Sequence, residues 1–140
     1  MLPAIDGTSD PGNIECLPTR EFAELIYAIE NLKPMSGWKD MKALPAEDQI
    51  KFIQFSQEME ALGILVAERL INMDLVDKTL GSFVTSSWNK FKLMFYDART
   101  NIPDPFLAEY FQWLAERIEE RMQKTSREPY FVSGKINHER

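Results

Sequence analysis

Hydrophobic residues recur along the chain at the three- and four-residue spacing of helices that have one buried side. A first stripe lies between Thr19, a residue type suited to cap a helix N-terminus, and Pro34, which ends the pattern. The stretch that follows, 35–44, is ambiguous, since Ser36 could cap a short helical turn but Gly37 weakens it. The apolar members of the first stripe are Phe22, Leu25, Ile26, Ile29 and Leu32.

A longer helix is predicted after Pro45, and its stripe is broader than a two-helix contact requires. Asn72 and Asp74 then interrupt the pattern and offer capping oxygens to a second long helix. The first of these stripes holds Phe52, Phe55, Met59, Leu62, Val66 and Leu70, flanked by Ile53, Ile64 and Ile71. The second holds Leu75, Val76, Leu80, Phe83, Val84, Trp88, Phe91 and Phe95.

Such a short connection predicts an antiparallel αα-hairpin that folds about Asn72. Gly63 and Gly81 are equidistant from that turn, so we expect them to face each other where the two backbones approach closely. Asp104 and Pro105 are interpreted as the cap and first turn of a last helix that ends at Lys124.

The fold predicted from these patterns is an all-α, single-domain helical bundle of about four helices, built on the long antiparallel hairpin. The domain covers residues 1–140, with an irregular arm at 1–18, a helical core at 19–124 and a tail at 125–140. Within the tail, the apolar run 130–132 is typical of a segment docked on the bundle.

The composition and charge narrow the range of functions. The net charge is −6, and acidic and basic residues are intermixed, which disfavours nucleic-acid binding because phosphate recognition needs clustered Lys and Arg. The single cysteine, Cys16, cannot form an internal disulfide and fits a reducing compartment. Without a secretory signal pattern or a membrane-length apolar run, we expect a cytoplasmic protein that is not inserted in a membrane.

Residues for familiar catalysis are sparse. The one histidine, His138, lies close to the C-terminus, and Cys16 has no base beside it in the sequence. The chain has no Glu-x-x-His pair for a di-metal bundle and no phosphate loop, so we expect no catalytic residue, metal or cofactor, although a carboxylate-only magnesium site stays open. Glu60 neighbours Ile53 and Ile64 on its helix, and a structural bond to an Arg, Trp88 or Ser86 is the favoured reading.

The predicted hairpin and last helix contain several distinctive segments, which are Glu60–Val66, Leu70–Val76, Gly81, Trp88, Arg99 and Phe111–Ala115. Together these segments resemble an uncharacterised helical family, domain of unknown function 4760. The resemblance spans roughly residues 50–118, although Arg69 and Leu70 stand where the family pattern has a small residue. It implies a helical fold without an assigned activity, and it marks Glu60 and Arg99 as a matched pair.

Two functional hypotheses remain. The first is a non-catalytic protein–protein interaction or self-associating module, whose candidate interface is Trp38, Tyr130 and Phe131. The second is a small ligand- or cation-binding bundle, with or without enzymatic activity, that uses Glu60, Arg99 and Tyr96. Trp88 and Trp113 are assigned to the core, whereas Trp38 fits either a core or an interface role.

Overall fold

The computed structural model describes residues 19–125 and 128–132. Within those ranges the chain is helical and contains no strand, which confirms the all-α prediction. Cys16 and His138 lie outside the described residues. The helices are α1 (Arg20–Asn31), α2 (Trp38–Lys42), α3 (Ala46–Ala67), α4 (Met73–Asn101) and α5 (Glu109–Lys124).

The first two helices begin at local side-chain caps. The hydroxyl of Thr19 accepts a hydrogen bond of 3.1 Å from the backbone N–H of Phe22, so α1 starts where the sequence predicts. At α2 the carboxylate of Asp40 accepts from the N–H groups of Ser36 at 2.8 Å and Gly37 at 3.2 Å. These two bonds close the turn, so the ambiguous stretch contains a five-residue helix despite its glycine.

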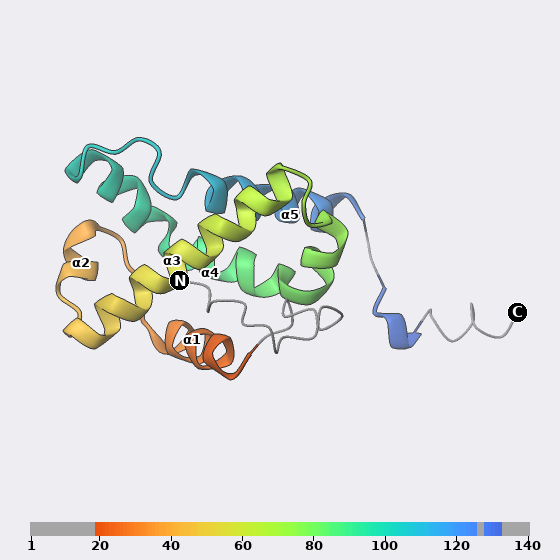
Figure 1. Ribbon diagram of the computed structural model, residues 1–140, viewed down its shortest axis with the longest axis horizontal. Coiled ribbons are helices and arrows are strands. Elements are labelled where there is room, and N and C mark those ends of the chain that lie inside the picture. Colours follow the sequence, from red (N-terminus) through yellow and green to blue (C-terminus); the bar gives the residue numbers. More distant parts are fainter. Residues whose placement is uncertain (1–18, 126–127, 133–140) are drawn as a thin grey trace, which may run out of the picture.

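Helices α3 and α4 reverse direction at Asn72, whose side chain caps α4 by accepting from Asp74 N–H at 2.7 Å. Phe52, near the start of α3, consequently meets the later part of α4. Its ring centroid lies 5.0 Å from that of Phe91 and 5.7 Å from that of Phe95. The backbones of α3 and α4 nevertheless stay largely apart, and α3 crosses in front of α4 in Figure 1.

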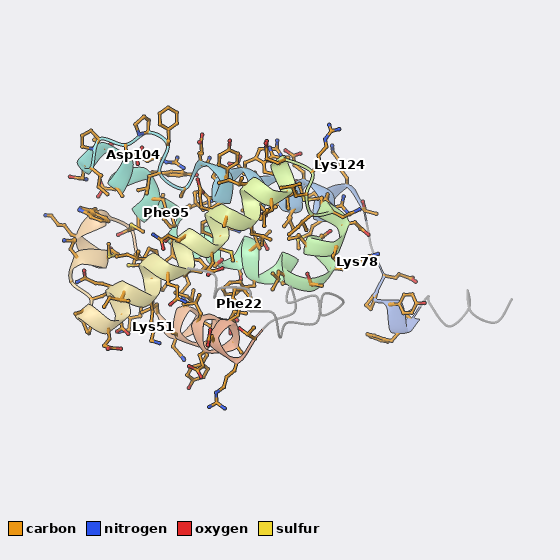
Figure 2. The ribbon with its side chains drawn as sticks, in the orientation of Figure 1. Phe22, Lys51, Lys78, Phe95, Asp104 and Lys124 are labelled. Carbon is orange, nitrogen blue, oxygen red and sulfur yellow. The ribbon has the colours of Figure 1, made fainter. Side chains whose placement is uncertain are left out.

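Helix α5 lies against both members of this pair and makes the most extensive contacts in the molecule. Its residue Phe111 is fully buried, and its ring centroid is 5.5 Å from that of Phe55 of α3 and 5.1 Å from that of Trp88 of α4. Figure 2 shows Lys78, near the start of α4, and Lys124, at the end of α5, at the same end of the molecule. The core is therefore a three-helix arrangement, which α1 extends by packing on α3 and α2 by packing on α4.

The start of α5 differs from the predicted start at Asp104 and Pro105. The helix begins at Glu109, and the residue before it, Ala108, has a left-handed conformation with φ of 59°. Asp104 instead closes a local turn, its carboxylate accepting from Phe106 N–H at 3.0 Å. The left-handed residue interrupts the helical path, so residues 102–108 form turns.

None of the helices in the described ranges is long and apolar enough to cross a membrane.

Candidate functional site

Glu60 projects from α3 toward the first turn of α5. It is partly buried, and its Oε1 atom accepts a hydrogen bond of 2.9 Å from the backbone N–H of Phe111. Ala108, the capping residue of α5, offers no side-chain acceptor of its own. A helix N-terminus carries unpaired N–H groups and a partial positive charge, so the carboxylate of Glu60 serves as a cap supplied from another helix.

Gly63, one turn further along α3, lies against the backbone of the first turn of α5. A Cβ atom at this position would collide with the carbonyl oxygen of Tyr110 and come within 2.7 Å of its carbonyl carbon. Only glycine therefore allows α5 to lie this close to α3. Together Glu60 and Gly63 form a docking site for the α5 N-terminus, in which one residue binds the backbone and the next makes room for it.

The prediction that Gly63 and Gly81 face each other is wrong. Gly81 is buried against α5, where an added Cβ would lie 3.5 Å from the Ile118 side chain and 2.5 Å from the carboxylate of Asp77 in its own helix. Both glycines face α5 because that helix, rather than the other member of the hairpin, lies closest to each backbone.

Arg99 holds the segment that leads into α5. Its Nε atom donates to the carbonyl oxygen of Leu107 at 2.8 Å, and its guanidinium lies 5.6 Å from the centroid of the Tyr96 ring. Tyr96 in turn lies edge-on to Trp88, with centroids 5.9 Å apart. Tyr96 and Arg99 are thus neighbours on one side of α4.

The predicted ion pair between Glu60 and Arg99 is wrong, since none joins them among the residues that the structure describes. Each side chain binds backbone instead, Arg99 at Leu107 and Glu60 at Phe111. The two side chains therefore bind the same short segment, residues 107–111, at its two ends. The structural reading of Glu60 agrees with this geometry, although its partner is a backbone N–H rather than an Arg, Trp88 or Ser86.

Two further side chains cap helices across the fold, and the sequence reasoning missed both. Asp97 of α4 accepts from the N–H of Trp38, the first residue of α2, at 2.8 Å. Lys90 of α4 donates to the carbonyl oxygens of Ile29 and Glu30, both at 3.1 Å, at the C-terminal end of α1. Each charge has the sign that stabilises the helix end it meets.

The pKa values of two groups report these environments. Burial lowers the pKa of Lys90 from its ordinary value, opposed in part by the nearby charge of Glu30. The pKa of Asp40 is lowered from 3.8 mainly by the backbone N–H groups of Ser36 and Gly37, which stabilise its ionised form.

The three predicted interface residues have different surroundings. Trp38 is half-buried and packs against the core, and the Lys42 ammonium lies 5.8 Å from its ring centroid. Tyr130 and Phe131 are 63% and 75% exposed on a helical turn that projects beyond the end of α5 in Figure 1. Val132 is also 49% exposed, so the expectation that residues 130–132 dock their apolar side chains on the bundle is wrong.

A second apolar surface lies on α3, on the side opposite its buried phenylalanines. We call it the α3 stripe, and Ile50, Ile53 and Ile64 are 64%, 47% and 39% exposed there. The two neutral residues between them, Gln57 and Ala61, are also exposed. The stripe consists of Ile50, Ile53, Gln57, Ala61 and Ile64.

Two surface hollows accompany these features. One, of about 670 Å³, lies between α1 and the start of α3 and is lined in part by Tyr27, Asp48 and Lys51. The other, of about 530 Å³, lies beside Asp77 and Arg121, which form an ion pair of 3.2 Å. Glu60, Tyr96 and Arg99 line neither hollow. The described residues include no cluster of three or more His, Cys, Asp or Glu side chains suited to a metal ion.

Comparison with known proteins gives one family match. The model of the family described as "Domain of unknown function (DUF4760)" matches residues 17–118, a range that contains α1 to α4 and most of α5. No curated protein and no solved structure gives a significant match.

Proposed function

Because the chain belongs to the DUF4760 family, whose description assigns no activity, we propose from its surface that it is a non-catalytic helical module for protein–protein interaction. The observation that carries this proposal is the α3 stripe. Three isoleucines exposed along one helix face present apolar area that water solvates poorly, and exposed apolar surface of this kind is typical of protein interfaces.

The alternative of a ligand- or cation-binding bundle has weaker support. The polar groups available to it, the Glu60 carboxylate and the Arg99 Nε atom, are already bound to the backbone of the segment that leads into α5. A ligand there would have to displace a helix cap, at a cost in stability of about 1 kcal/mol. The exposed edge of Tyr96 beside Arg99 is the part of this site that stays accessible.

The projecting turn with Tyr130 and Phe131 supports the interaction proposal as a second apolar surface. Trp38 contributes less, because its ring is half-buried and its backbone N–H is bound to Asp97. The lone cysteine, Cys16, supports a reducing location such as the cytoplasm.

Native mass spectrometry of tagged protein isolated from its own host tests the proposal. We expect the wild type to retain a protein partner, either another chain or a second copy. Ile53→Asp and Ile64→Asp variants should lose it, while Ser82→Asp, on an exposed part of α4, should keep it. Circular dichroism checks that all variants are folded. A wild type that appears alone even at high protein concentration, or a partner retained equally by every variant, would overturn an interaction through α3.

A further inference from the structure

We propose that the partner of the α3 stripe is a second copy of this chain, which pairs its own α3 stripe antiparallel about Gln57. The inference rests on the proposed function and identifies the partner of that same surface. It follows from the charge, the spacing and the size of the side chains on one helix face.

The lack of charge on the α3 stripe favours its pairing with the α3 stripe of a second copy. The α3 stripe and the exposed Gln54 beside it contain no charged side chain, although 27% of the chain is charged and the net charge is −6. The exposed Glu58 lies beyond Gln54, at the edge of this face. The exposed side of α5, in contrast, carries charged residues of both signs, among them Glu116, Glu120 and Lys124. Two copies that met through α5 would have to take these charges out of water, whereas the α3 stripe meets its own copy without burying a charge.

The spacing of the stripe is symmetric about its polar residue. Ile50 and Ile64 are each seven residues from Gln57, or about 10.5 Å along the helix axis at 1.5 Å per residue. A twofold axis through Gln57 therefore brings Ile50 of one copy level with Ile64 of the other, at both ends of the contact. Such a contact is closed and self-complementary, as dimer interfaces are.

The residues between these ends favour the antiparallel over the parallel direction. In the antiparallel pair, Ile53 lies level with Ala61 of the other copy, so a large side chain meets a small one. A parallel pair would set Ile53 against Ile53 and Ala61 against Ala61, which leaves a gap at the second level, and it would also align the two helix dipoles unfavourably. At the centre, the two Gln57 amides can donate to and accept from each other, and a single polar pair in an apolar seam fixes its register.

A single helix face is smaller than the surface of about 800 Å² per partner that stable complexes bury. The pair is therefore expected to dissociate on dilution. Covalent capture suits such a pair, because it detects weak contacts that chromatography at low concentration would miss.

Disulfide capture measures the direction of pairing. All variants carry Cys16→Ser, so that the introduced cysteine is the only thiol. An equimolar mixture of Ile50→Cys and Ile64→Cys proteins, under mild oxidation, should form the mixed disulfide at least about tenfold faster than either forms its own dimer. Gln57→Cys alone should dimerise at a comparable rate, and Ser82→Cys, on the exposed side of α4, gives the background rate of random collision.

Homodimers of Ile50→Cys and Ile64→Cys that outpace the mixed product would overturn the antiparallel arrangement. Rates at the Ser82→Cys background for all α3 variants, with a monomer in sedimentation at high concentration, would overturn pairing with a second copy. If protein from the host still held a different chain that Ile53→Asp releases, the proposed interaction function would stand and only the identity of the partner would fall.

Discussion

The carboxylate of Glu60 accepts a hydrogen bond from the backbone N–H of Phe111, 51 residues further along the chain. The beginning of α5 is therefore determined by a side chain of α3. This relationship connects the most plausible polar candidate in the sequence to the packing of the three-helix core, and it leads to a first prediction.

Replacement of Glu60 by alanine should lower the free energy of unfolding by about 1–2 kcal/mol, because a capping acceptor is lost at a partly buried helix end. Glu60→Gln keeps an oxygen acceptor and removes only the charge, so its loss should be smaller, about 0.3–1 kcal/mol. Urea denaturation followed by circular dichroism measures both values. The control is Glu58→Gln, an exposed site on the same helix, and an equal effect there would refute the capping role.

Alanine at the two core glycines should give unequal results. Gly63→Ala forces a methyl group against the Tyr110 backbone, which cannot move without shifting α5, and should cost about 1–3 kcal/mol despite the better helix propensity of alanine. Gly81→Ala meets the end of the Asp77 side chain, which can rotate, so its cost should be smaller. Thermal denaturation of both variants tests this order, and equal losses would contradict the close approach at Gly63.

Removal of the Lys90 ammonium should loosen the end of α1. In Lys90→Met the carbonyl oxygens of Ile29 and Glu30 lose their charged donor, so the last turn of α1 should exchange its amide hydrogens faster, while the centre of α3 stays unchanged. Lys90→Arg keeps a donor and should retain most of the protection. Hydrogen exchange with mass spectrometry distinguishes these outcomes, and unchanged exchange in α1 would count against the cap.

The same lysine should affect the alkaline pH dependence. Since the pKa of Lys90 is lower in the folded than in the unfolded chain, the unfolded state binds more protons at pH values between the folded pKa and 10.5. The contribution of Lys90 to the free energy of unfolding should therefore increase as the pH rises from its folded pKa to 10.5. The free energy of unfolding of the wild type minus that of Lys90→Met, measured over this range, should increase with pH. A flat or falling difference would contradict a lowered pKa of Lys90 in the folded chain.

In acid, Asp40 should act in the opposite sense. Its pKa is lowered in the folded chain by the N–H groups of Ser36 and Gly37, so its contribution to stability is present above the unfolded value of 3.8 and is lost as pH falls toward the folded value. Asp40→Asn should be less stable than the wild type at neutral pH, with the difference shrinking below about pH 4. Thermal midpoints measured against pH test this, with Glu58→Gln as the control.

The periodicity of the sequence was sufficient to predict α1, α3, α4 and the reversal at Asn72, because local caps and apolar spacing depend on neighbouring residues. Thr19 and Asn72 both cap the helices that the sequence assigned to them. The place of α5 could not be obtained in this way. Its packing against Gly63 and Gly81 depends on how three stripes share one core, and its start depends on Glu60, far away in the sequence.

The polar candidates show the same division between local and distant information. Tyr96 and Arg99 lie three residues apart on one helix, so their proximity follows from helical spacing. The partners of Arg99 and Glu60 are backbone atoms of residues 107 and 111, and backbone atoms leave no mark in a sequence pattern. The one signal for this docking site in the sequence was the spacing of Glu60 and Gly63, which lie one helical turn apart. Glu60 offers a hydrogen-bond acceptor, and Gly63 leaves space for another backbone.

The distant cap of α5 also determines the order in which the molecule can assemble. A nascent or truncated chain that ends within residues 102–108 would already hold Glu60 and Gly63 in α3, but the face that they form would be uncovered. A separate peptide of residues 107–124 lacks an N-terminal cap of its own and should be largely unstructured in isolation. Mixed together, the two fragments should complement each other, with the peptide gaining helix as it docks, and Glu60→Ala in the larger fragment should weaken that reconstitution.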